Sequence, residues 1–254
     1  MEFSQITVAA VYSYMLIFTR VGACIMVMPG VGERYVPVRI RLLIALVITV
    51  IVQPLAAPYL PEAIPTAPLG LFLIVLNEVV VGVFFGLVAR LLISTSHMAG
   101  MIIGYQSGLA AAMMFDPNTG AQGSTIGAFL TLISTVLFLL TDLHHLLLIA
   151  VVDSYSLFIP ANDIMSDDMA HFITHVISES FLIAMKISAP YIVIGLLLYL
   201  GAGIMSRLMP NMQIFFVLMP VPIMIGFVIL AITLPVVMLW YMEHIREMIG
   251  LFIK

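Results

Sequence analysis

Charged residues and cysteine are both scarce in this sequence. Charged side chains make up 9% of the 254 residues, and the formal net charge is −4. This balance predicts neither a nucleic-acid-binding surface nor a basic patch for anionic lipid headgroups. Cys24 is the single cysteine, which excludes an internal disulfide and a metal site built from several thiolates. We interpret it as a small, buried apolar side chain.

The motifs of common enzyme active sites are missing as well. The sequence has no H-E-x-x-H, no G-x-S-x-G and no glycine-rich phosphate loop, so we expect neither an enzyme nor a cofactor. Asp142, His144 and His145 stand together in "TDLHHLLL", but adjacent histidines on a helix point about 100° apart. We therefore interpret them as interfacial side chains. His171 and His175 share a helix face without a convincing third ligand, so no metal site is expected.

Long apolar segments fill most of the chain. Hydrophobic residues make up 63% of it, and its mean hydropathy is +1.22. Six runs are long enough to cross a hydrocarbon layer: Ile6–Val31, Ile40–Leu60, Leu69–Ser96, Ile126–Val152, Phe181–Met205 and Ile214–Trp240. The first is interpreted as a retained helix, because no basic residue precedes Arg20. The sequence predicts an all-α polytopic membrane protein of about six helices in hairpins, forming a single membrane domain over residues 1–254.

Basic residues in the connections indicate the orientation of these runs. The first, third and fifth connections carry Lys or Arg, and the second and fourth do not. The odd connections are therefore expected on the cytoplasmic side, although Arg246 and Lys254 near the opposite end weigh against this. Gln53–Pro68 contains five prolines and predicts a rigid turn. The acidic stretch Asp153–Ser180 predicts an amphipathic helix from Asp163 onward.

Arg20, Glu78 and Lys186 lie inside the apolar runs. Charges at the bilayer centre are costly and should face protein or water. Gly82 and Gly86 follow Glu78 at four-residue steps, which predicts one helix face with an acid and two positions for close helix contact. A structural ion pair of Glu78 with Arg20 or Lys186 is favoured over a proton relay.

The stretch Gly104–Ser124, "GYQSGLAAAMMFDPNTGAQGS", is rich in small residues and matches neither a good helix nor a solvated loop. "DPNTG" is typical of a turn. Irregular backbone at membrane depth is tolerated only where protein buries it or where it borders an aqueous cavity. We expect a buried or pore-lining segment, in which Met113 and Met114 supply flexible, polarizable side chains.

Several stretches, in their order along the chain, resemble the FliR family of flagellar export-gate membrane proteins, which has relatives in virulence type III secretion systems. These stretches are "RVGACIMVMPGVGERYVPVRIRLLIAL", "NEVVVGVFFG", "GYQSGLAAAMMFDPNTG", "TDLHHLLLIAVVDSYSLFIP" and "AMKISAPYIVIGLLLYLGAGIMSRLMPNMQIFFVLMPVPI". One departure stands at the last hairpin tip, where Asn211 and Gln213 exchange the order of amides common in the family.

The resemblance implies a subunit of the flagellar type III export gate at the bacterial inner membrane and the flagellar basal body. It implies FliP and FliQ type subunits and an FlhB type protein as partners, contact with lipid, and unfolded flagellar proteins as substrates. Residues 1–180 would be FliP-like and 181–254 a FliQ-like hairpin, in a helical complex. A pore plug at 104–124 would include Gly104, Gln106, Gly108, Met113, Met114, Phe115, Asp116 and Pro117. A cytoplasmic tip would include Arg207, Pro210, Asn211 and Gln213.

A secondary transporter that uses Glu78 and Lys186 as coupling residues remains the alternative. A clear internal two-fold repeat would support it, and none is seen. The sequence also leaves open whether the host machine is flagellar or of the virulence type.

Overall fold

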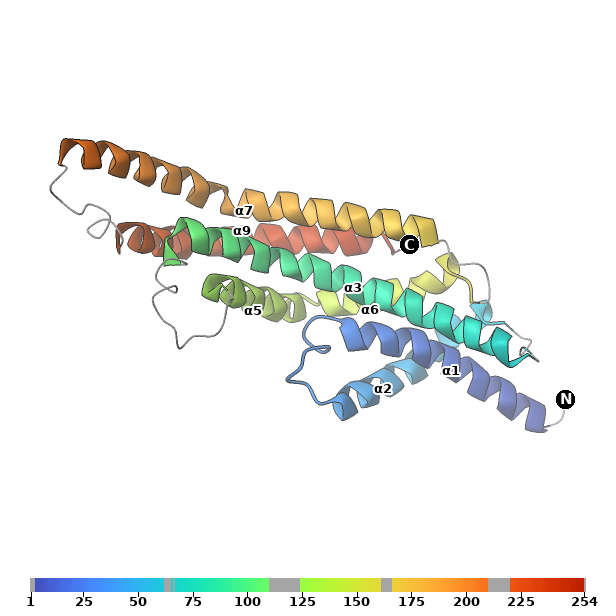
Figure 1. Ribbon diagram of the computed structural model, residues 1–254. Helices are drawn as coiled ribbons and strands as arrows, with labels where there is room; N and C mark the ends of the chain where they lie inside the picture. The colour runs from blue at the N-terminus through green and yellow to red at the C-terminus, as the bar shows by residue number, and fades with distance from the viewer. Residues whose placement is uncertain are drawn as a thin grey trace. The chain divides into compact units, whose positions relative to one another are not determined.

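The computed structural model describes residues 3–61, 65, 67–109, 124–160, 166–209 and 220–253. Within these ranges all regular structure is helical (Figure 1). The elements are α1 (Phe3–Val27), α2 (Val38–Ala56), the 3-10 helix η1 (Ala57–Tyr59), α3 (Pro68–Gln106), α5 (Thr125–Leu140), α6 (Leu143–Leu157), α7 (Ser166–Leu208) and α9 (Pro220–Gly250). Five helical segments are long and apolar enough to cross a membrane, lying in α1, α2 with η1, α3, α7 and α9. The prediction of an all-α polytopic membrane protein is confirmed.

The fourth predicted run is broken. Instead of one helix over Ile126–Val152, α5 and α6 meet at a bend of 67°, and the pair makes a sixth span if counted as one. The bend occurs at Asp142, which has left-handed backbone angles of φ 57 and ψ 19. Aspartate tolerates this conformation better than apolar residues do, so Asp142 ends one helix direction and begins the next.

Two other boundaries differ from the sequence-based expectation. The acidic stretch is helical from Ser166, but it is the first part of α7 and continues into the fifth apolar run without a break. Asp167 and Asp168 in the first turn of α7 favour this start, because acidic side chains complement the positive end of a helix. The proline-rich turn is shorter than predicted, since α2 continues through Pro54 to Ala56.

Contacts between Cα atoms divide the chain into two compact units. Unit 1 contains Met1–Leu92, Phe138–Val176 and Ile245–Lys254, and unit 2 contains Ile93–Leu137 and Ile177–His244. This division reflects which segments pack together. The predicted division into residues 1–180 and 181–254 reflects likeness to FliP and FliQ type subunits instead, and it stays a prediction.

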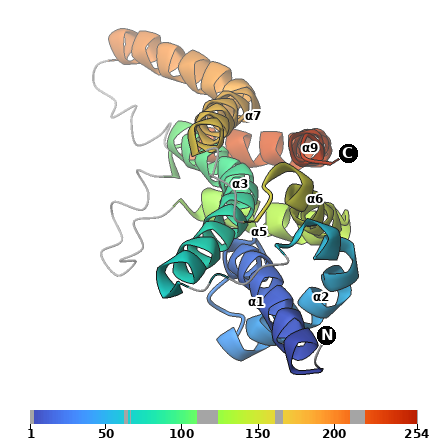
Figure 2. The ribbon, with the colours of Figure 1, turned by 90° about the vertical axis from the view of Figure 1, so that its right-hand side faces the viewer.

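In unit 1, α1 and α2 form a hairpin, and α6 packs on both of them (Figure 2). Gly22 of α1 lies close to Ala45 of α2, with 3.9 Å between an ideal Cβ at the glycine and the alanine Cβ. Leu16, Ile17 and Leu147 are fully buried. The core of this unit therefore lies between the first hairpin, α6 and the first part of α3.

In unit 2, polar contacts join the helices of an otherwise apolar core. Tyr191 of α7 and Thr233 of α9 place their hydroxyl oxygens 3.3 Å apart. The Ser188 hydroxyl of α7 lies 3.2 Å from the carbonyl oxygen of Ala99 in α3, and also 2.8 Å from the carbonyl oxygen of Ala184 in its own helix. These contacts hold α7, α9 and the end of α3 together.

Candidate functional site

Arg20 of α1 and Glu78 of α3 form an ion pair in the core of unit 1. Arg20 Nε donates to Glu78 Oε2 at 2.7 Å, and Arg20 Nη2 donates to Glu78 Oε1 at 2.9 Å. The two side chains are each 1% exposed. Of the two partners considered for Glu78, the structure has Arg20. Two parallel hydrogen bonds of this kind set the relative orientation of the two side chains and also strengthen the pair.

α6 and Phe158, which directly follows it, supply the remaining partners of Arg20. The guanidinium donates from Nη1 to Ser154 Oγ at 3.0 Å and from Nη2 to the carbonyl oxygen of Phe158 at 2.8 Å. The Ser154 hydroxyl in turn donates to the carbonyl oxygen of Val151 at 2.6 Å. The guanidinium carbon lies 3.9 Å from the centre of the Tyr155 ring, within reach of a cation–π interaction. One arginine thus joins α1, α3 and α6.

Small residues allow α1 and α3 to approach closely beside this pair. A Cβ at Gly82 would collide with the carbonyl oxygen of Arg20 and would lie 2.8 Å from the Cβ of Ala23. A Cβ at Gly86 would lie 2.8 Å from the carbonyl oxygen of Cys24. The prediction of two close-contact positions after Glu78 is confirmed. Cys24 is buried, as interpreted from the sequence.

Lys186 and Arg90 are two further charges inside the apolar helices, and neither is among the contacts described for Arg20. Lys186 belongs to unit 2, its side chain is exposed, and it forms no ion pair within the described ranges. Arg90 is also exposed. Because both carboxylate oxygens of Glu78 already bind Arg20, the arrangement favours a structural clamp over the coupled use of Glu78 and Lys186 in a transporter.

A second candidate site is formed by the two ends of the predicted plug segment, both in unit 2. α3 ends at Gln106, and Gly108 follows with φ +72, a left-handed conformation that suits glycine after a helix. On the other side, Ser124 caps the start of α5 by accepting from the backbone N–H of Gly127 at 3.1 Å. The Ser124 hydroxyl also lies 3.0 Å from the carbonyl oxygen of Gly100 in α3.

Glycines bring these two ends together. An ideal Cβ at Gly104 would lie 2.9 Å from Ser124 Oγ, and one at Gly100 would collide with the backbone of Gly127. The end of α3 and the start of α5 therefore lie next to each other, and glycines form the contact between the two helices. The sequence indicated an irregular segment here, but not that its ends are joined.

The end of α3 also fits against notches in α7 and α9. An ideal Cβ at Gly195 of α7 would lie 2.7 Å from Gln106 Oε1, and one at Gly226 of α9 would lie 2.8 Å from the Cβ of Ser107. Tyr191 and Pro222 help to line a small cavity at this junction. Neither glycine was identified from the sequence, because a helical glycine in an apolar run gives no sign of its partner.

Some predicted site residues fall outside the described ranges. Of the plug set, Gly104, Gln106 and Gly108 are described, and Met113, Met114, Phe115, Asp116 and Pro117 lie outside. Of the hairpin tip, Arg207 is described and exposed near the end of α7, whereas Pro210, Asn211 and Gln213 lie outside.

An aromatic cluster at the C-terminal end was not predicted. In unit 1 the ring of Phe252 lies against three others, with centroid distances of 4.9 Å to Phe85, 5.9 Å to Phe84 and 4.7 Å to Phe172. Edge-to-face arrangements at such distances are favourable. Residues beyond α9 are thus fixed to α3 and to the first part of α7.

Comparison with known proteins finds a matching family and several similar proteins. The family described as bacterial export proteins, family 1, matches residues 11–248. The flagellar biosynthetic protein FliR of Caulobacter vibrioides is 35% identical over 97% of this chain and 98% of its own length. FliR of Bacillus subtilis is 29% identical over 89% and 87%. The Yop proteins translocation protein T of Yersinia pestis is 28% identical over 87% and 85%.

None of these three relatives is named for a chemical reaction; their names describe flagellar biosynthesis or translocation. The match covers the helices that carry the ion pair and both ends of the plug segment. The chain therefore belongs to family 1 of the bacterial export proteins, the FliR family, as a membrane-embedded helical member.

Proposed function

We propose that this chain is a non-catalytic subunit of the flagellar type III protein export gate. It forms a channel for unfolded flagellar proteins together with FliP and FliQ type subunits, in the inner membrane at the flagellar basal body. An FlhB type protein contacts it on the cytoplasmic side, near the tip that includes Arg207. The family match over residues 11–248, and relatives named for flagellar biosynthesis and translocation, support this proposal.

The segment 104–124 helps to close the channel. The observation that carries this part is the contact of Gly104 with Ser124, beside the backbone contact of Gly100 with Gly127. A segment whose two ends are joined in this way can move while α3 and α5 stay packed. Met113, Met114 and Phe115, within this segment, supply deformable apolar side chains suited to sealing.

The experiment measures ion leak through the assembled complex in lipid bilayers. Deletion of Gly108 to Asp116 removes part of the segment 104–124, including Met113, Met114 and Phe115, and is expected to raise the resting conductance. A matched variant keeps the length and replaces Met113, Met114 and Phe115 by serine, so that sealing is tested separately from segment length. Resting conductance equal to that of the unchanged complex in both variants would refute the closure role.

Co-purification tests the subunit assignment independently of the plug. A stable complex with two other small membrane proteins supports a gate subunit. A monodisperse chain that binds a small solute by itself would support a transporter instead.

A further inference from the structure

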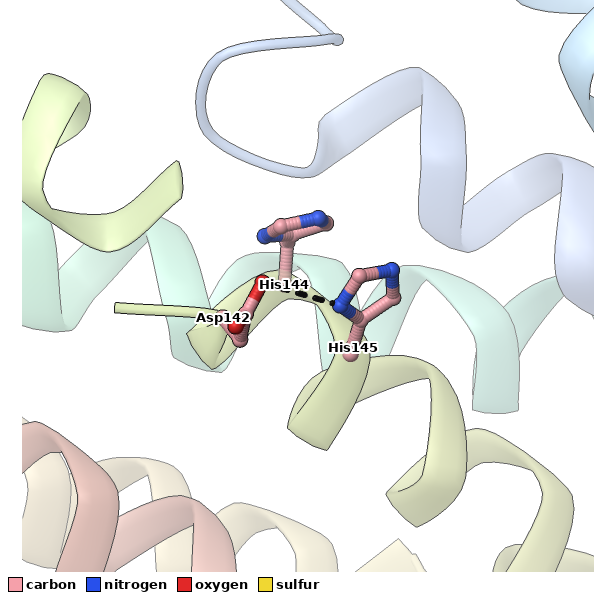
Figure 3. Close-up of side chains that lie close together, drawn as sticks. All are labelled: Asp142, His144 and His145. Carbon is pink, nitrogen blue, oxygen red and sulfur yellow. Dashed lines mark hydrogen bonds and ion pairs between the residues drawn. The ribbon is translucent and has the colours of Figure 1, made fainter. Parts of the chain in front are cut away.

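Three side chains with metal-binding atoms gather where α5 ends and α6 begins. Figure 3 shows Asp142, His144 and His145 grouped at the start of α6. One ligand atom from each residue lies within 4.8 Å of the other two. Among the described residues this is the only group of three histidine, cysteine or acidic side chains so arranged. It belongs to unit 1 and plays no part in the Arg20–Glu78 network.

Two of these atoms already have the spacing of metal ligands. His145 Nδ1 lies 3.2 Å from Asp142 Oδ1. Zinc binds imidazole nitrogen and carboxylate oxygen at about 2.0–2.2 Å, so neighbouring ligand atoms in a tetrahedral site lie about 3.3 Å apart. The ligand atom of His144 needs to approach by at most roughly 1.5 Å to reach the same spacing. Rotation about its side-chain torsions supplies a movement of this size.

His144 has a ring nitrogen without a partner. Its Nδ1 is shielded from solvent and has no hydrogen bond within the described part of the chain. A buried polar atom left unpaired carries a desolvation cost, and a bound cation would offset it. The two imidazole rings lie with their centroids 4.0 Å apart and tilted by 36°. Although adjacent positions on a helix point about 100° apart, side-chain rotation brings these two rings together.

We propose that Asp142, His144 and His145 bind one Zn²⁺ ion at the junction of α5 and α6. Two imidazoles and a carboxylate are a ligand set that zinc prefers. The Asp142 carboxylate also offsets the partial positive charge at the start of α6. Because Asp142 stands at the bend and both histidines lie in the first turn of α6, the ion joins the first turn of α6 to the residue at the bend. Water completes the coordination.

Zinc binding to the purified full-length chain in detergent tests this site. Competition with a chelating indicator measures the stoichiometry and the affinity, and Co²⁺ replaces Zn²⁺ for a visible absorption spectrum. One ion per chain is expected, with the strong absorption of tetrahedral Co²⁺. His145→Ala and Asp142→Asn should each weaken binding at least about tenfold, since each removes one of three protein ligands.

The variants are chosen to keep the fold. His145 and Asp142 are 65% and 75% exposed, and asparagine tolerates the left-handed backbone that Asp142 adopts. The control is His171→Ala with His175→Ala on the exposed start of α7, where Asp167 lies 3.7 Å from His171 but no three-ligand group forms among the described residues. The proposal would be overturned if the unchanged chain showed no saturable binding, if His145→Ala and Asp142→Asn bound zinc as tightly as the unchanged chain, or if only the control variant lost binding.

Discussion

The Arg20 side chain is the most fully bonded charge in the described core. It has five polar or aromatic contacts with Glu78, Ser154, Phe158 and Tyr155, at distances between 2.7 and 3.9 Å. A buried ion pair contributes little compared with apolar residues of similar volume, but breaking it leaves an uncompensated charge. The pair therefore adds little stability, but α1, α3 and α6 must pack correctly for the buried charges to be paired.

Glu78→Gln removes the charge while keeping the shape, so Arg20 stays buried without a counterion. We expect a loss of stability of about 3–5 kcal/mol, seen as a lower Tm of the chain purified in detergent. The double variant Arg20→Met with Glu78→Met should recover much of this loss, because it leaves no unpaired charge. A double variant no more stable than Glu78→Gln would contradict the interpretation.

Among the elements, helix existence could be predicted from the sequence and helix ends could not. Apolar runs of span length locate α1, α2, α3, α7 and α9, because the bilayer sets their composition and their least length. However, α3 and α9 continue well beyond the predicted ends at Ser96 and Trp240, and α7 begins well before Phe181. The bend at Asp142 was missed, since its cause is the backbone angle of one residue within an apolar run. The continuity of α7 was missed because its first turns are acidic and its later ones apolar, although one helix accommodates both.

The end of α9 gives a prediction at this scale. Phe252→Ala removes ring contacts with Phe84, Phe85 and Phe172, each worth about 0.5–1.5 kcal/mol beyond the buried area. Hydrogen exchange of residues 245–253 should become faster by about tenfold or more, which corresponds to about 1.4 kcal/mol. Leu251→Ala is the control, because Leu251 is 68% exposed; similar rates in both variants would argue against the aromatic anchor.

At the scale of the whole molecule, a site residue could be predicted only where the neighbouring sequence shows its role. The close helix contact at Glu78 could be predicted, because an acidic residue followed by two glycines is unusual within an apolar run. Gly195 and Gly226 were not found, since their role depends on Gln106 and Ser107, far away in the sequence. The sealing residues Met113, Met114 and Phe115 and the tip residues Pro210, Asn211 and Gln213 lie outside the described ranges and remain predictions.

Gly226 of α9 lies against Ser107, at the start of the predicted plug segment. This contact gives a prediction for the proposed assembled complex. An ideal Cβ at position 226 lies only 2.8 Å from the Cβ of Ser107. The side chain introduced by Gly226→Leu therefore collides with Ser107, and the end of α3 must shift. We expect swimming motility and export of flagellar proteins to fall at least about tenfold, with the protein still present in the membrane. Gly203→Leu is the matched control on α7, since no described atom lies within 4 Å of its ideal Cβ. Equal motility of the two variants would show that this notch is not needed.

The Arg20 network also has a consequence for the order of biogenesis. Its carboxylate partner follows 58 residues later in the chain, and its partners Ser154 and Phe158 follow 134 and 138 residues later. When α1 first leaves the ribosome, its arginine has none of these partners, and an isolated arginine at a helix centre disfavours insertion by about 2.5–3.5 kcal/mol. The N-terminal helix should therefore wait at the insertion machinery until α3 arrives with Glu78. Its final placement in the membrane then depends on residues that have not yet been translated when it emerges.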